Sequence, residues 1–316
     1  MRRVLMLLPL LALALAGGCG TAGRSVAPSG STSASATGDP VPSTAPTPSP
    51  RPAATKAEEL VRAVPQPTEA APPASGGGGD DDGAPSQGSG TGGLTSLSGN
   101  TRNQIVWAPL SNPSAVRSEG SVSRYKAWST SKVLVVAAYL DTVVDGDPSR
   151  ISSGDRSLIR AALTRSDGDA VVAIRERIPG SPGSAITSVL RSIGDSSTSA
   201  PDRSQGAMSW SPREQVRFMA ALAAGRVVSA EASAWLLGQM QPISAHRWGL
   251  GTIGASSFKG GWLTSDSETR QMGIVGGYAV AIITVGEGPA VVQTDGDSAH
   301  VQQMNRLAAL LAKRLG

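Results

Sequence analysis

The 316-residue sequence has a single cysteine, Cys19, and only two histidines, His246 and His300. One cysteine excludes an intrachain disulfide, so a packed core must stabilise the fold. A catalytic triad of the chymotrypsin or lipase type needs a histidine base, and residues 101–316 contain no Gly-x-Ser-x-Gly motif to accompany one. Ligands of the right type and spacing for a metal site are also lacking. We therefore expect no histidine-dependent triad, no metal and no cofactor.

The chain begins with a short targeting segment. Its basic start, Met-Arg-Arg, is followed by an apolar run from Val4 to Ala16 and then by Gly-Gly-Cys19. The run is too short to span a bilayer and is typical of a secretory signal. Its end resembles a bacterial lipoprotein signal, which implies cleavage after residue 18 and a lipid on Cys19. We expect export and anchoring to the outer face of the bacterial cytoplasmic membrane; an ordinary signal peptidase site with an incidental thiol is the alternative.

Residues 19–100 are mostly Ser, Thr, Pro, Ala and Gly. Such a composition buries too little apolar surface to offset chain entropy, which predicts a disordered linker. Residues 101–316 are enough for one domain with a core. The formal net charge is only +4 and the arginines are scattered, so we expect no nucleic-acid partner for this exported chain.

Lysine is scarce: the chain has five, and three of them follow a serine by three positions. These pairs are Ser123/Lys126, Ser129/Lys132 and Ser256/Lys259. Only the pair of Ser129 and Lys132 opens a long apolar helix, where the amine and the hydroxyl share one face. Burial disfavours the charged amine, so Lys132 is a candidate base for a Ser129 nucleophile. A capping serine followed by a surface lysine is the alternative interpretation.

The hydrophobic periodicity predicts two short strands, a block of helices, three strands and a last helix. The expected strands cover residues 104–108, 115–117, 256–262, 270–275 and 279–285. The expected helices begin near residues 130, 153, 171, 184, 212, 229 and 298. This order predicts an α/β fold with two lobes, in which an antiparallel sheet combines strands from both ends of the domain and a helical lobe fills the middle.

Three motifs occur in a set order: Ser129-x-x-Lys132, Ser166-Asp167-Gly168 and Lys259-Gly260-Gly261-Trp262. Over residues 101–316 this series resembles the penicillin-recognising serine hydrolases, which include class A β-lactamases and D,D-peptidases. The Lys-x-Gly-Trp form of the third motif is similar to that of actinobacterial lipoproteins in this family. The resemblance implies the two-lobed β-lactamase/transpeptidase-like fold.

The resemblance also implies roles for these residues. Ser129 is the expected nucleophile, Lys132 its base, Ser166 a proton relay and Lys259 its partner. In the family, main-chain amides of the nucleophile and of the third-motif strand hold the oxyanion, here near Trp262. The residues expected to contact substrate are Gly260, Gly261, Trp262, Arg270, Asp167 and Gly168, with Arg270 as a second carboxylate anchor. A surface role for Arg270 is the alternative.

Three departures from the family pattern weaken the prediction of efficient β-lactam hydrolysis. Gly168 replaces an Asn, Gly260 replaces a Thr, and residues 200–208 contain no Glu to deacylate the enzyme. Asp202 and Gln205 are the candidates to replace that Glu. We therefore expect an acyl-enzyme on Ser129 with weak deacylation, formed from a β-lactam or a peptidoglycan stem peptide. The alternative is a catalytically degraded lipoprotein of this fold that binds cell-wall peptide or a protein partner.

Overall fold

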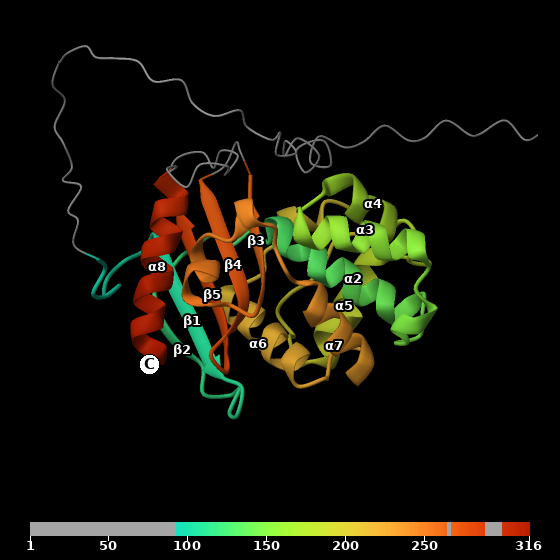
Figure 1. Ribbon diagram of the computed structural model, residues 1–316, viewed down its shortest axis with the longest axis horizontal. Coiled ribbons are helices and arrows are strands. Elements are labelled where there is room, and N and C mark those ends of the chain that lie inside the picture. Colours follow the sequence, from blue (N-terminus) through green and yellow to red (C-terminus); the bar gives the residue numbers. More distant parts are fainter. Residues whose placement is uncertain (1–92, 264–266, 288–298) are drawn as a thin grey trace, which may run out of the picture. The chain divides into compact units, whose positions relative to one another are not determined.

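The computed structural model describes residues 93–263, 267–287 and 299–316 (Figure 1). The predicted signal, Cys19 and most of the predicted linker lie outside the described residues. The packed chain begins somewhat before residue 101, because Leu97 is only 1% exposed and belongs to the same core cluster as the C-terminal helix. Arg314 of that helix forms an ion pair with Glu119, which also fixes this N-terminal stretch.

Five strands form one antiparallel sheet in the order β2-β1-β5-β4-β3. Their bounds are β1 Asn103–Pro109, β2 Arg117–Gly120, β3 Ser257–Trp262, β4 Glu268–Val275 and β5 Tyr278–Val285. The first two strands therefore join the last three, as the order of elements predicted. The position of β2 was predicted wrongly at residues 115–117, because Ala115 and Val116 still belong to the turn that leads into the strand.

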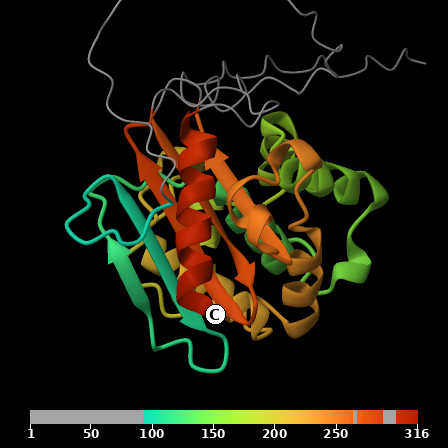
Figure 2. The ribbon, with the colours of Figure 1, turned by 60° about the vertical axis from the view of Figure 1, so that its left-hand side comes forward.

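Side chains of each central strand alternate between two core clusters, one on each face of the sheet. In β1, Ile105 packs towards α8 (Ala299–Leu315), whereas Val106 packs towards the helical lobe. Figure 2 shows α8 lying across its face of the sheet. Because both faces are covered, the central strands read as nearly continuous apolar runs.

The helical lobe surrounds α2 (Ser131–Thr142), whose residues from Ser131 to Leu140 are all buried. Its other helices are α3 Ser153–Thr164, α4 Gly168–Arg175, α5 Pro182–Ser192, α6 Pro212–Ala223 and α7 Ala230–Gln239. Short 3-10 helices lie in the connecting segments of the chain: η1 Trp128–Thr130, η2 Pro148–Arg150, η3 Gln205–Ala207, η4 Ser244–His246 and η5 Gly249–Ile253. A helix buried on every side matches the run of apolar residues that follows Lys132.

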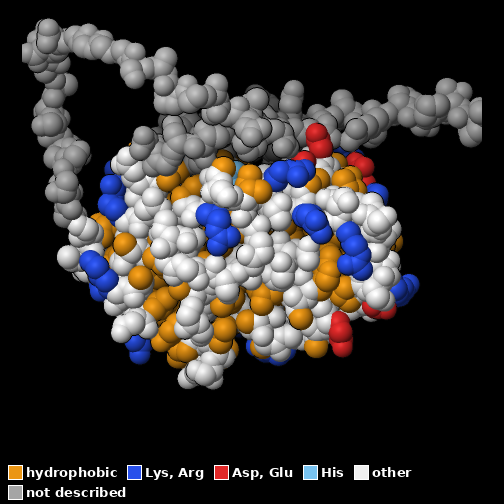
Figure 3. Space-filling model, in the orientation of Figure 1, with side chains coloured by type: hydrophobic (Ala, Val, Ile, Leu, Met, Phe, Trp, Pro, Cys, Tyr) orange, Lys and Arg blue, Asp and Glu red, His pale blue; other side chains and the backbone are white. Residues whose placement is uncertain are grey.

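Side-chain caps fix most helix starts. Ser211 accepts the Glu214 N–H at the start of α6, and Ser229 accepts the Ala232 N–H at the start of α7. Both helices begin within a residue of the predicted positions. The helix α3 begins at residue 153 as predicted, and Ser152 caps it, because the Ser152 hydroxyl accepts the Asp155 N–H at 3.1 Å. On the face shown in Figure 3, Lys and Arg side chains lie in separate groups rather than in one patch.

Candidate active site

Ser129 and Lys132 form a direct hydrogen bond inside the protein. The Lys132 Nζ atom donates to the Ser129 Oγ atom at 2.6 Å, and both side chains are buried. Ser129 lies in η1, and α2 begins two residues later, so the helical spacing brings amine and hydroxyl together as predicted. Burial lowers the pKa of Lys132 to about 8, while the nearby Asp167 charge acts in the opposite direction. The amine can therefore lose its proton near neutral pH.

The backbone before Ser129 adopts an uncommon conformation. Trp128 has a φ of 43°, in the left-handed region that non-glycine residues rarely occupy. Such conformations persist only where surrounding contacts enforce them, and they concentrate at functional sites. Here the Trp128 ring is buried, and the Lys126 Nζ atom lies 4.9 Å from its centroid. The turn at Trp128 therefore directs Ser129 towards the sheet, and α2 begins directly afterwards.

Ser166 and Lys259 form a second pair of hydroxyl and amine, this time across the two lobes. The Lys259 Nζ atom donates to the Ser166 Oγ atom and to the Gly260 carbonyl oxygen, at 2.8 Å each. Ser166 precedes α4 with a φ of 62°, and Lys259 lies on β3. Burial, and then the charge of Lys132, hold the pKa of Lys259 well below its usual range. The first and third motifs are thus close enough for their amines to interact.

The free edge of β3 faces the serine. β3 is the end strand of the sheet and the strand nearest to the helical lobe in Figure 1. Phe258 donates its N–H off this edge to the Met240 carbonyl oxygen. Because backbone groups alternate along a strand, the N–H groups of Gly260 and Trp262 point to the same edge. The Trp262 N–H therefore lies on the edge of β3 that is not paired with β4.

Gly261 permits β3 to approach η1 closely. A β-carbon added at Gly261 would lie 2.9 Å from the Ser129 nitrogen and 3.0 Å from the Thr130 nitrogen. These separations are too short for a real side chain, so the position requires glycine. The approach places the Ser129 N–H beside the third motif. The main chain of η1 and of β3 thus forms one wall of the site.

Gly168 and Gly260, the two glycines that replace an Asn and a Thr of the family motifs, have different surroundings. A β-carbon added at Gly260 would lie 3.1 Å from the Cζ3 atom of Trp262, so the Trp262 ring covers the face where the family carries a hydroxyl. Gly168 is the first residue of α4, and Asp167 caps that helix by accepting the Ala170 N–H at 2.9 Å. Asp167 and Gly168 therefore lie near Ser166 and Lys132, and Asp167 also caps the start of α4.

The structure does not bring Arg270 to the substrate side of the site. Its side chain is fully buried, its Nη1 atom donates to the Trp210 carbonyl oxygen at 3.2 Å, and its Nη2 atom lies 3.8 Å from Glu268. Arg270 pairs with Gly261 in the sheet, so its side chain points into the fold behind η1. This burial contradicts the alternative of a surface residue, and the contacts of Arg270 give the role of substrate anchor no support.

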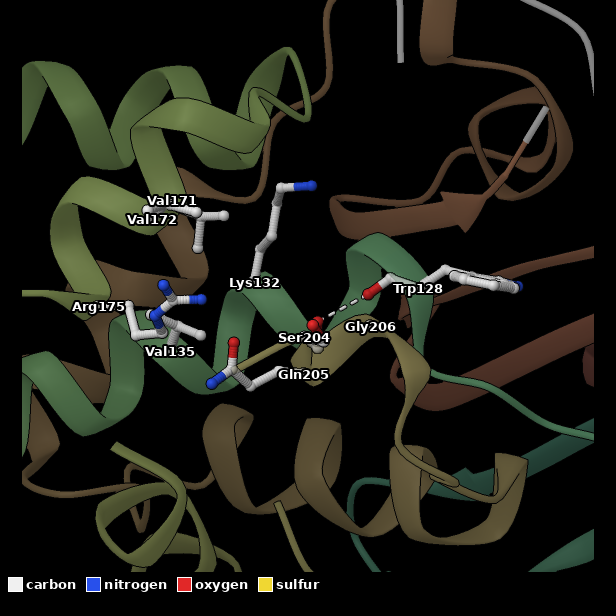
Figure 4. A pocket seen from close by; sticks show the side chains of 10 residues that line it. Trp128, Lys132, Val135, Val171, Val172, Arg175, Ser204, Gln205 and Gly206 are labelled. Atoms are coloured by element: carbon white, nitrogen blue, oxygen red, sulfur yellow. Dashed lines mark hydrogen bonds between the residues drawn. The ribbon is translucent and has the colours of Figure 1, made fainter. Parts of the chain in front are cut away.

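A small cavity lies beside Lys132. Its volume of about 30 Å³ is room for a water molecule. Figure 4 shows Arg175 and Gln205 among its lining side chains. Gln205 donates to the carbonyl oxygens of Pro201 and Asp202, at 3.0 and 2.8 Å. The Asp202 carboxylate instead accepts hydrogen bonds from Ser181 and the Gly183 N–H. Of the two candidate replacements for the deacylating Glu, only Gln205 therefore reaches the cavity.

His246 is a site neighbour that the sequence pattern did not reveal. Its ring packs edge-on against Trp262, with centroids 5.0 Å apart, and 9% of the residue is exposed. Burial, followed by the charges of Lys259 and Lys132, lowers the pKa of His246 to about 4. It is neutral at neutral pH and cannot add a cation to the site. Nothing in its local sequence marks it, because the contact depends on how η4 packs against β3.

No group of three or more potential metal-ligating side chains occurs among residues 93–263, 267–287 and 299–316. In the same part of the chain, no helix is long and apolar enough to cross a membrane.

Comparison with known proteins identifies the fold. No protein-family model matches the chain, and no curated protein matches its sequence. Solved structures do match: a TLA-1 extended-spectrum β-lactamase variant has 12% identity and a TM-score of 0.52, covering 68% of this chain and 93% of that one. The chromosome-encoded β-lactamase of Vibrio parahaemolyticus has 17% identity and a TM-score of 0.50, covering 67% and 93%. The penicillin-binding protein PBP-A has 17% identity and a TM-score of 0.50, covering 70% and 92%.

The described domain therefore has the fold of the penicillin-recognising serine hydrolases, as the three motifs predicted. At such low identity the likeness concerns the fold alone. Activity has to be argued from the side chains of this chain.

Proposed function

We propose that this protein is a serine hydrolase that forms an acyl-enzyme on Ser129 with a β-lactam or with an amide of a peptidoglycan stem peptide. The observation that carries the proposal is the 2.6 Å hydrogen bond between the Lys132 Nζ and Ser129 Oγ atoms, buried at the free edge of β3. A binding module has no use for a buried amine beside a serine, because burying an amine costs free energy. The similarity to β-lactamases and to PBP-A supports the choice of substrates.

The proposed step balances its protons. Neutral Lys132 accepts the Ser129 proton while the oxygen attacks the carbonyl carbon, and the main-chain N–H groups of Ser129 and Trp262 stabilise the oxyanion. The C–N bond then breaks, and Ser166 delivers a proton to the departing nitrogen. Lys259, at 2.8 Å, holds the Ser166 hydroxyl in place and replaces the proton that it gives away. Acylation thus ends with Lys132 as the ammonium and Lys259 as the neutral amine, and return of one proton from Lys132 to Lys259 restores both.

We further propose that the acyl-enzyme is hydrolysed slowly. The cavity beside Lys132 has room for a water, but the residues that line it include no carboxylate. The Gln205 amide is not a base, and Asp202 is bound to the start of α5. The role that a Glu performs in class A β-lactamases is thus left to Lys132, which the acylation step already uses.

Intact-protein mass spectrometry of the full-length chain with benzylpenicillin tests this function. We expect a covalent adduct that persists for minutes or longer, and that is absent from Ser129→Ala. Ser123→Ala is the matched control, because Ser123 also precedes a lysine by three positions but is exposed. That variant should retain the adduct. Absence of both adduct and turnover would favour a binding module, and rapid turnover without adduct would contradict slow deacylation.

We also propose that the protein is exported and held at the membrane by a lipid on Cys19. The basis is the basic and apolar start of the chain, followed by Gly-Gly-Cys. Expression in a bacterium with a labelled fatty acid should label the wild-type protein but not Cys19→Ala. Equal labelling of the two, or none in the wild type, would refute the anchor.

A further inference from the structure

Aromatic rings form a wall in the part of the site next to Lys259. The Trp262 ring lies over Gly260, where an added β-carbon would be 3.1 Å from it. The ring of His246 packs edge-on against Trp262 at 5.0 Å, and that of Trp248 at 5.4 Å. The wall therefore occupies the place of the hydroxyl that the third motif lacks.

The cations next to this wall are already engaged within the fold. The Lys259 ammonium donates to the Ser166 hydroxyl and to the Gly260 carbonyl oxygen, which leaves one proton for a ligand. The Arg270 guanidinium is fully buried and interacts with the Trp210 carbonyl oxygen and with Glu268. Of these two cations, Lys259 is thus the one that can donate to a ligand group lying between Lys259 and Trp262.

Such a wall disfavours a negative charge. A carboxylate that leaves water needs several hydrogen bonds or a cation to offset its lost hydration, whereas an ester or a carboxamide loses much less. His246 does not supply the missing charge, since burial and the neighbouring lysines lower the pKa of its imidazole to about 4. Aromatic rings, by contrast, make favourable contacts with neutral, partly apolar groups.

We infer that Trp262 and His246 are specificity-determining residues, and that the site accepts acyl donors carrying an uncharged ester or amide beside Lys259 at least as well as the free acids. This inference rests on the proposed function, because it concerns which donors acylate Ser129. It predicts substrates that carry an uncharged group beside Lys259, where the family resemblance implies a carboxylate.

Benzylpenicillin and its methyl ester test the inference, because they differ only at that carboxyl group. The rate of adduct formation on Ser129 of the full-length chain is measured for each at low, equal concentrations. We expect the ester to react as fast as the acid or faster. Where a site pairs the carboxylate with charged donors, losing that contact costs about 10- to 100-fold in rate. An acid faster by that factor would overturn the inference while the proposed function stands.

If neither compound forms an adduct, the proposed function fails and the inference fails with it. The two failures are therefore distinguishable. The variant Gly260→Ser combined with Trp262→Phe supplies a second measurement, because phenylalanine removes the ring portion nearest Gly260 and serine supplies a hydroxyl. We expect it to shift the ratio of rates towards the acid by about tenfold relative to Trp262→Phe alone. An unchanged ratio between these two variants would contradict the role of the wall.

Discussion

At the scale of single residues, the chemistry depends on the protonation of Lys132. Its side chain is 2% exposed, and burial lowers its pKa to about 8 against the opposing effect of Asp167. Below that pH the amine is mostly protonated and cannot accept the Ser129 proton. Above it the neutral amine predominates and acylation proceeds at its full rate.

The rate of adduct formation with benzylpenicillin should therefore rise from pH 6 and level off above about pH 8. Lys132→Met should reduce it by about 100-fold or more at every pH, because the base is lost. Lys313→Met, a change at an exposed lysine of α8, should retain the wild-type profile. Intact-protein mass spectrometry at a series of pH values checks this. A rate independent of pH would argue against Lys132 as the base.

At the scale of elements, the sequence predicted what local patterns encode. The buried helix after Lys132, the helix starts near residues 212 and 229, and the sheet built from strands of both ends of the domain follow from periodicity and turn signals. The junction at Trp128 was not predictable, because its left-handed backbone turns Ser129 into a 3-10 helix before α2 begins. Only the packing of the neighbouring elements enforces that conformation.

The candidate site was predicted in the same partial way. The motif residues meet because each motif lies at the end of a loop or on the edge strand, where the fold brings them together. The surroundings of the motifs come from contacts distant in sequence: Arg270 reaches the Trp210 carbonyl oxygen, and His246 packs edge-on against Trp262. No local pattern contains such information, so the burial of Arg270 was not predicted and a site histidine was not recognised.

At the scale of the whole molecule, folding buries basic groups at the junction of the two lobes. Lys132 belongs to the helical lobe and Lys259 to the sheet, and each is at most 2% exposed. Burial lowers the pKa of both amines below the ordinary value of 10.5. The unfolded chain therefore binds more protons than the folded one at alkaline pH, which links the stability of the entire domain to these amines.

The sign of this linkage gives a test. Below about pH 8 both states protonate Lys132, so the folded state carries the full cost of a buried ammonium. Between about pH 8 and 10.5 the folded state loses the proton first, and stability rises with pH. For Lys132 alone the complete shift corresponds to on the order of 3 kcal/mol, of which about 2 kcal/mol should appear by pH 9.5.

Urea unfolding of the full-length chain at pH 7 and pH 9.5 should therefore give a higher free energy of unfolding at the higher pH. Lys132→Met should reduce this gain, with Lys259 supplying what remains, while Lys313→Met should leave it as in the wild type. Tyr139 opposes the trend only at still higher pH, since burial and then its hydrogen bond to Asp155 raise its pKa to about 12. A wild-type gain of zero, or one that persists unchanged in Lys132→Met, would show that the buried amine is not held neutral by the fold.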